Sequence, residues 1–583
     1  MKIILKRIIS LVMIILMLCC SIVGCSKDNK KPADNTENNT ENNKEEPITL
    51  TVYSELSSWD GLQQGWGAKV LLDKFNVKLH VTYCAPESFG SDWVLEEPAD
   101  ILIFGGADNY AKAVNESMLY DWNEADLLKT HGAYIYENMS AALAKNKSLT
   151  SDITGGESDA LYGFGHDVAT DISDHEAYMY LWDIRWDLYS QLDNKGVNNL
   201  DDLIDVLTDM KALCPKDFYG EETYAVTMWP DWDVDNVMYV KSLASAYYGY
   251  DELGMGLYNV ETGEYYDTLK QDGPYMEMLK FFNKLYQKDL LDPASRTQTY
   301  EDASKKLMAG GAFWSIFGYA GSLSYNTEEN IKADKIMASL VPKDATPIVY
   351  GLAPQGGNRI CTIGADTEHP ELCMDIINWL CTPEGYMTYL YGPKELCWNY
   401  DEDGYTHFTE FGRKAYFNKD TKMEGDYEGL GSYGDGCFQL NFFPWSIYAS
   451  NPDSNGEVYS CTYWKSEQKE AKCDTESDWR CEFNLSSSTE YLDTIKHIVA
   501  PPTTFKLADK SAELKAIWDN VASIIKKYSW DAIYADSDAQ FDQIVSNMMA
   551  EADAAGYAQC TTWAKEQAAL RHVAEEQLRA TID

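Results

Sequence analysis

Residues 300–319, YEDASKKLMAGGAFWSIFGY, carry the signals of a helix, a turn and a strand in close succession. Three apolar side chains fall on one face at helical spacing: Ala303, Leu307 and Met308. The glycines at 310–311 adopt a left-handed conformation at little cost, so we expect the helix to end there. Residues 312–317 are almost entirely apolar, which is typical of a strand buried inside an α/β sheet. The stretch therefore predicts a helix and then a buried strand that runs out at Tyr319.

Strand and helix signals also alternate near the start of the chain. Residues 48–53 and 77–83 alternate apolar with polar side chains, residues 65–75 have helical spacing, and residues 99–104 (ADILIF) are continuously apolar. Strands separated by helical crossovers form a parallel, doubly wound sheet. Ligands of such sheets collect beyond the carboxyl ends of the strands. We therefore predict an α/β fold with its site in the loops after these strands.

The composition is that of a large and strongly acidic protein. The chain has 583 residues, of which 45% are hydrophobic, enough for two or more domains. The formal net charge is −45, from 93 acidic and 48 basic residues. Such a charge repels nucleic acid, acidic membrane surfaces and polyanions at long range. A neutral or cationic ligand is favoured, although a solvated acidic surface by itself also explains the charge.

The N-terminus has the layout of a secretory signal. Basic residues precede an apolar run that is short for a permanent membrane span. The run ends in Ile22-Val23-Gly24-Cys25, which resembles a bacterial lipobox and implies a signal peptide over 1–24 and diacylglycerol on Cys25. Residues 25–47 would then be the lipidated cysteine and a disordered tether, because they are too polar to bury a core. We expect a lipoprotein on the extracellular face of a Gram-positive-type cell membrane; an uncleaved signal anchor is the alternative.

Several segments resemble the family 1 extracellular solute-binding proteins of ABC importers. Within this family the resemblance is to the maltose-binding type and its lipoprotein subgroup. The run KLMAGGAFW up to Trp314 resembles the family segment that supplies a sugar-stacking aromatic, and LYGFG at 161–165 resembles the first strand between the lobes. Residues 353–363 and 370–391 resemble the return strand and the helix after it. The resemblance implies an α/β, two-lobed periplasmic-binding-protein-like fold of class II, each lobe a doubly wound sheet flanked by helices, with a helical C-terminal part.

The same resemblance implies how the chain is divided. Lobe 1 would comprise residues 48–165 and 346–395, and lobe 2 residues 166–345 and 396–583. Residues after 511 have helical spacing throughout, like the ending of the lipoprotein subgroup.

Candidate ligand-binding residues lie in loops and at the buried strand. The loop after the first predicted strand contains Glu55, Trp59 and Asp60, of which Trp59 and Asp60 are candidates. By resemblance, the loop after the strand at 99–104 contributes Asp108 and Asn109; the equal alternative is that these two residues only cap the following helix. The strand contributes Trp314, with a core tryptophan as the alternative, and Tyr319; Trp398 follows the expected return crossing.

The sequence TMWPDWD at 227–233 places two tryptophans and two aspartates in one loop. Pyranose rings present apolar C–H faces to indoles and hydroxyl edges to carboxylates. We therefore add Trp229, Asp231 and Trp232 to the candidates and expect at least one of the two tryptophans to be buried in its own lobe.

Three further features remain open in the sequence. Residues 399–410 fit the spacing of a calcium loop, but Asp403-Gly404 is also a good hairpin turn, which we favour over a metal site. Residues 435–487 have no clear period and could be an insertion that covers the cleft, with Trp445 and Trp464 as late contacts. The 14 cysteines leave an odd number after the leader and Cys25 are removed, and we read Cys373 and Cys381 as core thiols.

The leading hypothesis is a membrane-tethered receptor that closes two lobes on a carbohydrate, more specifically an oligosaccharide, and passes it to ABC permease subunits. It predicts a monomer with no catalytic residues, no cofactor, no metal and no nucleic-acid partner. The abundance of aromatic residues, with 40 Tyr and 17 Trp, favours a sugar. The alternatives are an exported glycan-degrading enzyme, which needs two carboxylates at a fixed separation, and a glycan-binding adhesin or scaffold.

Overall fold

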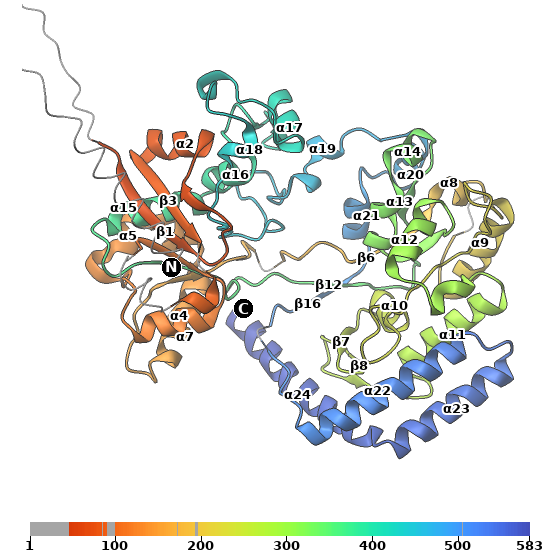
Figure 1. Ribbon diagram of the computed structural model, residues 1–583. Helices are drawn as coiled ribbons and strands as arrows, with labels where there is room; N and C mark the ends of the chain where they lie inside the picture. Colours follow the sequence, from red (N-terminus) through yellow and green to blue (C-terminus); the bar gives the residue numbers. More distant parts are fainter. Residues whose placement is uncertain are drawn as a thin grey trace, which may run out of the picture. The chain divides into compact units, whose positions relative to one another are not determined.

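The computed structural model describes residues 46–83, 85–89, 99–171, 173–192, 196–503 and 505–582 (Figure 1). The expected signal peptide, the lipidated Cys25 and nearly all of the tether lie outside the described residues. Pro47–Asp583 is one compact unit. Among the helices of the described ranges, none is long and apolar enough to cross a membrane.

The N-terminal part builds a six-stranded mixed sheet in the order β2-β3-β1-β4-β13-β5. β1 runs parallel to β3 and to β4, as the alternating strand and helix signals predicted. β2 pairs antiparallel with β3, and β13 lies antiparallel between β4 and β5. The strands are β1 Ile48–Ser54, β2 Asp60–Leu62, β3 Val77–Tyr83, β4 Ile101–Phe104, β5 Gly163–Gly165 and β13 Ile360–Ile363. Because β1 and β4 are parallel neighbours, the loops that follow them begin at the same edge of the sheet.

Helices pack around this sheet. α15 contacts β13 as well as α5, α6 and α16, so the helix expected from PELCMDIINWLC is part of the first core. The helices of this part are α2 Gly65–Phe75, α4 Ala107–Asn115, α5 Leu127–His131, α6 Ala133–Asn138, α7 Ser140–Ile153, α15 Pro370–Cys381, α16 Pro383–Tyr391, α17 Glu410–Phe417 and α18 Tyr433–Gly436.

The opening stretch of sequence folds as predicted. α12 spans Tyr300–Met308 and starts with a capping box in which Thr299 and Asp302 exchange hydrogen bonds. The turn after it places Gly310 at φ +79°, a conformation that a residue with a side chain adopts only at a cost. β10, Trp314–Phe317, then enters a three-stranded antiparallel sheet in the order β10-β6-β11, with β6 Tyr180–Arg185 and β11 Met337–Ser339. This second sheet is smaller than the doubly wound sheet that we expected.

Helices dominate the rest of this part. They are α8 Trp186–Tyr189, α9 Leu200–Leu213, α10 Met238–Tyr248, α11 Pro274–Gln287, α13 Ser322–Tyr325, α14 Glu328–Lys332, α20 Asp474–Phe483 and α21 Ser488–Thr494. A small sheet contains β7 Asp251–Leu253, β8 Gly256–Tyr258 and β9 Tyr265–Tyr266. The C-terminal part is helical, as predicted: α22 Ala512–Ile533, α23 Asp538–Ala554 and α24 Tyr557–Ile582.

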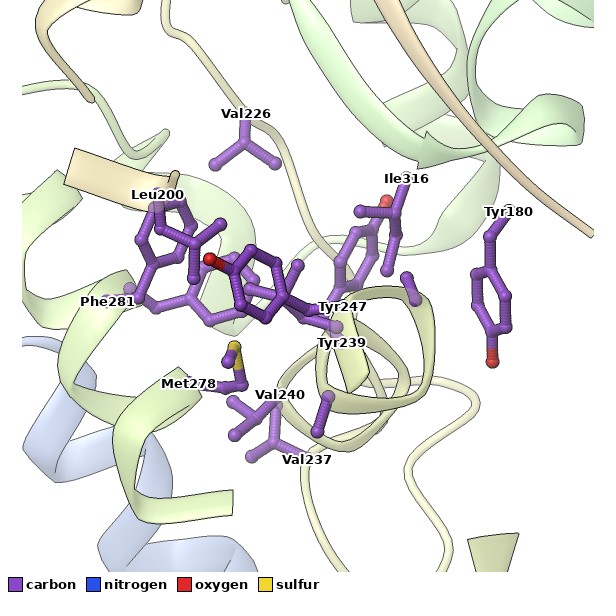
Figure 2. Close-up of a cluster of buried hydrophobic side chains, with 14 of the residues drawn as sticks. Tyr180, Leu200, Val226, Val237, Tyr239, Val240, Tyr247, Met278, Phe281 and Ile316 are labelled. Atoms are coloured by element: carbon purple, nitrogen blue, oxygen red, sulfur yellow. The ribbon is translucent and has the colours of Figure 1, made fainter. Parts of the chain in front are cut away.

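Two large hydrophobic cores organise the chain. The first core contains side chains of β1, β3, β4, β13 and α15, and the second contains side chains of β6, α9, α10, α11, β10 and the C-terminal helices. Figure 2 shows part of the second core, in which Tyr239 and Val240 of α10 and Met278 of α11 are labelled; the two helices contact each other. The two-lobed α/β fold with a helical C-terminal part is therefore confirmed.

The cores correct the expected division of the chain. Residues 397–464 contribute Trp398, Tyr433 and other side chains to the first core, whereas the sequence assigned 396–583 to lobe 2. The reason is close backbone packing: a Cβ on Gly436 of α18 would meet the Trp66 ring at 2.2 Å, so this segment sits directly on α2. Conversely, Ile348 and Val349 belong to the second core, although residues 346–395 were expected in lobe 1.

The segment 399–410 is a hairpin. β14, Trp398–Tyr400, pairs antiparallel with β15, Thr406–Phe408, and Gly404 in the turn has φ +82°. The turn interpretation is therefore confirmed. Within the described ranges, no group of three His, Cys, Asp or Glu side chains is arranged to hold a metal ion.

The segment 435–487 is packed rather than free to cover a site. Trp445 and Trp464 are both fully buried in the first core, which corrects their expected role as late contacts. Backbone pairing fastens Trp445 to Val168, and α19, Lys465–Gln468, packs on β15. The segment thus braces the chain where it leaves β5.

Hydrogen bonds fix the segment that connects the two cores. Asp174 is buried, and its carboxylate accepts five hydrogen bonds, from the Thr170 amide and hydroxyl, the Asp171 amide, and the Ser450 amide and hydroxyl. The next residues pair with the return segment, since His175 forms a bridge with Gly351. β12, Ile348–Tyr350, then pairs with β16, Ile498–Ala500.

Ten cysteines lie in the described chain, and all ten are free thiols. Cys373 and Cys381 are buried in the first core, as predicted, and burial raises the pKa of the Cys373 thiol to about 12.

Candidate functional site

Four aromatic rings come together where the loop 227–233 meets α12 and β10. The ring of Trp232 lies 4.7 Å from that of Tyr300 at an interplanar angle of 32°, and 5.6 Å from that of Tyr319 at 46°. Trp229 meets Trp232 edge-on at 5.3 Å and Tyr300 at 4.8 Å. We call Trp229, Trp232, Tyr300 and Tyr319 the aromatic cluster.

The members of the cluster differ in exposure. Trp229 is only 1% exposed, whereas Trp232 is 43% exposed, so one tryptophan is buried in its own core and the other faces solvent. The burial of Trp229 agrees with the expectation that at least one tryptophan of this loop is buried. Tyr300 and Tyr319 are half-buried beneath and beside Trp232. The cluster therefore offers an apolar face whose rings are held by one another.

The local fold explains why these residues meet. α12 and β10 follow each other through a tight turn, so the first residue of the helix and the residue after the strand return to the same end. The Asp231 carboxylate accepts the backbone N–H of Tyr300 at 3.0 Å, which ties the loop to the start of α12. Trp229, Asp231, Trp232 and Tyr319 are thus brought together as candidates.

A carboxylate anchors the far end of the loop. Asp233 accepts hydrogen bonds from the backbone N–H of Met238 at 2.8 Å and from the indole N–H of Trp530 at 2.8 Å. Burial raises the pKa of Asp233 to about 6 in spite of these bonds. Its role is to hold the loop against α22, since Trp530 belongs to that helix.

Trp314 does not belong to the aromatic cluster. It is 1% exposed and packs between Trp182 at 5.8 Å and Phe281 at 5.9 Å in the second core. A strand buried on both faces has no side chain directed to solvent, which is why the core alternative is correct here. Trp398 is also a core residue: it is fully buried and its indole N–H donates to the Gly392 carbonyl at 2.9 Å.

A second group of polar residues lies at the carboxyl ends of β1 and β4. Glu55 follows β1, and its carboxylate accepts the Gly105 N–H at 2.7 Å and the Asn109 side-chain amide at 2.6 Å. The same amide donates to the Pro86 carbonyl at 2.8 Å. Phe89 holds the 85–89 loop in place because its ring packs on Tyr53 at 5.7 Å and on Phe104 at 5.3 Å.

The other candidates in this region are placed differently. Asp108 is exposed in the first turn of α4, but no side-chain cap bond is formed at the N-cap Gly106. Trp59 is half-buried against the first core, and Asp60 is exposed in β2, which pairs with β3 at the edge of the sheet. Asn109 is therefore the candidate of this region that the structure connects to a second loop.

Two residues of these groups, Tyr300 and Glu55, were not among the sequence candidates. Tyr300 begins α12, and because a helix followed by a strand returns to its starting end, this position could have paired it with Tyr319. Glu55 was noted in the loop after β1; the available signal was an acidic residue directly after a strand, which can meet the N-terminus of a helix such as α4.

The fold and the two groups of residues define a class of protein: a two-lobed α/β protein whose strand-end loops present an aromatic face and hydrogen-bond acceptors. Residues 103–392 match the family model of bacterial extracellular solute-binding proteins. The chain belongs to the bacterial extracellular solute-binding proteins, which confirms the resemblance found in the sequence.

One solved structure shares the fold of this chain, and two others have lower structural similarity. An HMO-binding, ABC-transporter-associated solute-binding protein from Bifidobacterium longum infantis ATCC 15697 is 11% identical over 90% of this chain and 99% of that chain, with a TM-score of 0.51. An extracellular solute-binding protein from Bifidobacterium longum subsp. infantis is 13% identical over 90% and 98%, with a TM-score of 0.49. The N-glycan transport solute-binding protein NgtS from Streptococcus pneumoniae is 14% identical over 89% and 98%, with a TM-score of 0.42. No curated protein sequence matches the chain.

Proposed function

We propose that this protein is the substrate-binding lipoprotein of an ABC transporter, anchored to the extracellular face of the membrane through Cys25, and that it captures an oligosaccharide for import. The observation that carries the proposal is the aromatic cluster, in which Trp232 is 43% exposed and supported by Tyr300 and Tyr319. An indole face held in this way suits the C–H face of a pyranose ring.

Family membership supports the binding and extracellular parts of the proposal. The structure from Bifidobacterium longum infantis, which shares the fold, is described as binding HMO and as associated with an ABC transporter. The net charge of −45 supports a ligand without negative charge. The protein acts by binding alone, without altering the sugar, and works as a monomer with permease subunits as its partners.

Ligand capture follows from two lobes that close. We take the lobes to follow the two cores, with residues 48–174 and 352–464 in one and residues 178–349 and 479–582 in the other. A sugar that contacts both lobes binds the closed form in preference to the open form and shifts the population toward it. Loops of both lobes then contribute to the site, the aromatic cluster from one and Asn109 from the other.

The test is a glycan array followed by calorimetry on the oligosaccharides that bind. Trp232→Ala is expected to weaken binding by roughly 30-fold, the effect of about 2 kcal/mol that a central aromatic contact carries. Tyr219→Ala is the matched control, because Tyr219 is 81% exposed in a different loop and should leave binding unchanged. Equal affinity of Trp232→Ala and the wild type would refute the role of the cluster.

Two further measurements test the remaining parts of the proposal. Incubation with each bound oligosaccharide should produce no new reducing ends; their appearance would favour a glycan-degrading enzyme. Cys25→Ala should move the protein from the membrane fraction to the medium, and an unchanged membrane fraction would contradict anchoring through this cysteine.

A further inference from the structure

Beyond the aromatic cluster, the structure assigns a role to a residue that no stacking argument uses. We infer that Glu55 is a positioning residue: it holds the Asn109 amide with both N–H groups turned inward and leaves the Asn109 Oδ1 to the ligand. The loops at the ends of β1 and β4 then accept hydrogen bonds from sugar hydroxyls, and their carboxylates disfavour a sugar that carries a negative charge. This inference rests on the proposed function for its ligand but not for its geometry.

The orientation of the Asn109 amide follows from its partners. Its Nδ2 lies 2.6 Å from Glu55 Oε1 and 2.8 Å from the Pro86 carbonyl oxygen. Both partners only accept hydrogen bonds, so each must receive one of the two N–H groups. The reversed amide would set Oδ1 against a carboxylate and a carbonyl at these distances, which is repulsive on both sides. Oδ1 therefore remains as the free polar atom of the side chain within the described chain.

Glu55 is itself held firmly. It is 7% exposed, and its Oε2 accepts the Gly105 N–H at 2.7 Å while its Oε1 also accepts the Tyr53 hydroxyl at 3.2 Å. A side chain at position 105 would crowd it, because a Cβ there would lie 3.3 Å from Oε2. The carboxylate also lies beside the N-terminal end of α4, where the helix dipole favours negative charge. These contacts restrict the Glu55 carboxylate to one position, and from there it orients the Asn109 amide.

The charged groups near Asn109 also disfavour an acidic ligand. Asp108 is an exposed carboxylate in the first turn of α4. Lys112, one turn further along, donates to the Phe89 carbonyl at 2.8 Å and lies over the Phe89 ring. Its ammonium is thereby engaged by the 85–89 loop. A hydroxyl or N-acetyl N–H of a sugar can donate to Asn109 Oδ1, whereas the carboxylate of a uronic or sialic acid would meet Asp108 and Glu55 with like charge.

The geometry is tested without a ligand by amide exchange. In protein labelled with ¹⁵N-asparagine, the side-chain signals of Asn109 are assigned by their loss in Asn109→Ser. Their exchange with water is expected to be about tenfold slower than that of the exposed Asn115, because both N–H groups are bonded. Glu55→Gln replaces an acceptor with a donor and should speed the exchange several-fold. Glu116→Gln is the matched control, an identical change at the exposed C-terminal end of the same helix.

The selectivity is tested with matched sugars. Maltotriose and N-acetylchitotriose are the neutral probes, and trigalacturonate and 3′-sialyllactose are the acidic ones. The neutral probe that binds best is expected to bind at least tenfold more tightly than either acidic probe, and Glu55→Gln should narrow that ratio. Equal or tighter binding of an acidic probe would overturn the selectivity. Exchange of Asn109 at the rate of Asn115 would overturn the positioning, whichever probes bind. If no glycan of the array binds, the proposed function fails. The exchange experiment still decides the role of Glu55 in that case.

Discussion

His166 should make the stability of this protein fall steeply in mild acid. The residue follows β5, is fully buried, and packs edge-on against Phe442 with a centroid separation of 5.2 Å. Neither ring nitrogen has a hydrogen-bond partner in the described part of the chain. Burial, with a smaller contribution from the positive charge of Arg359, lowers the pKa of His166 from 6.5 to about 3.

The direction and size of the effect follow from proton linkage. Above pH 6.5 the histidine is neutral in both the folded and the unfolded state and contributes nothing to the pH dependence. Between pH 6.5 and about 3, the unfolded state takes up a proton that the folded state refuses. The free energy of unfolding therefore falls, with a slope that approaches ~1.4 kcal/mol per pH unit, by about 2.3 kcal/mol between pH 6.5 and pH 4.5, because the unfolded histidine is already half protonated at pH 6.5.

Substitution separates this contribution from all other titrating groups. His166→Leu and His166→Phe remove the titration but differ in volume, so their stabilities at pH 7 will differ while both lose the same acid-dependent part. Urea unfolding followed by tryptophan fluorescence at pH 7.5, 6.5, 5.5 and 4.5 measures the difference from the wild type. We expect each variant to gain about 2.3 kcal/mol relative to the wild type between pH 6.5 and 4.5. A difference that stays constant over this range would refute a buried neutral histidine.

Three further predictions concern other residues. Trp314→Ala should lower the free energy of unfolding by about 3–5 kcal/mol, because it leaves a cavity between Trp182 and Phe281. An unchanged melting temperature would contradict the core position of Trp314. Asp183→Asn should gain stability relative to the wild type as the pH rises from 4 to 7, since burial raises the pKa of Asp183 to about 7 and the unfolded state of the wild type ionises over this range while the folded state keeps the proton; a pH-independent difference in urea unfolding would contradict this. Asp174→Ala should cost about 2–4 kcal/mol and speed amide exchange at Ser450, whereas the exposed neighbour in Asp171→Ala should change neither, and equal effects would remove the special role of Asp174.

Local patterns in the sequence were sufficient where they are dictated by the backbone. The stretch 300–319 predicted α12, its glycine turn and β10, because helical spacing, a left-handed turn and a continuous apolar run each depend on neighbouring residues alone. The strands β1 and β3, the C-terminal helices and the hairpin at 399–410 followed for the same reason. The loop 227–233 was also expected to bury at least one tryptophan, and Trp229 is buried.

The tertiary structure decided what depends on partners far away in the chain. Trp314 and Trp398 have the residue type of a sugar contact, but only packing shows that both are buried in cores. The assignment of 397–464 to the first core depends on the close approach of α18 to α2, which no local pattern records. Glu55 acquires its role because β1 and β4 are neighbours in the sheet, which brings residues 55 and 109 within hydrogen-bonding distance. Sequence periodicity thus determined the elements and the class of fold, and long-range packing determined which side chains are left to meet a ligand.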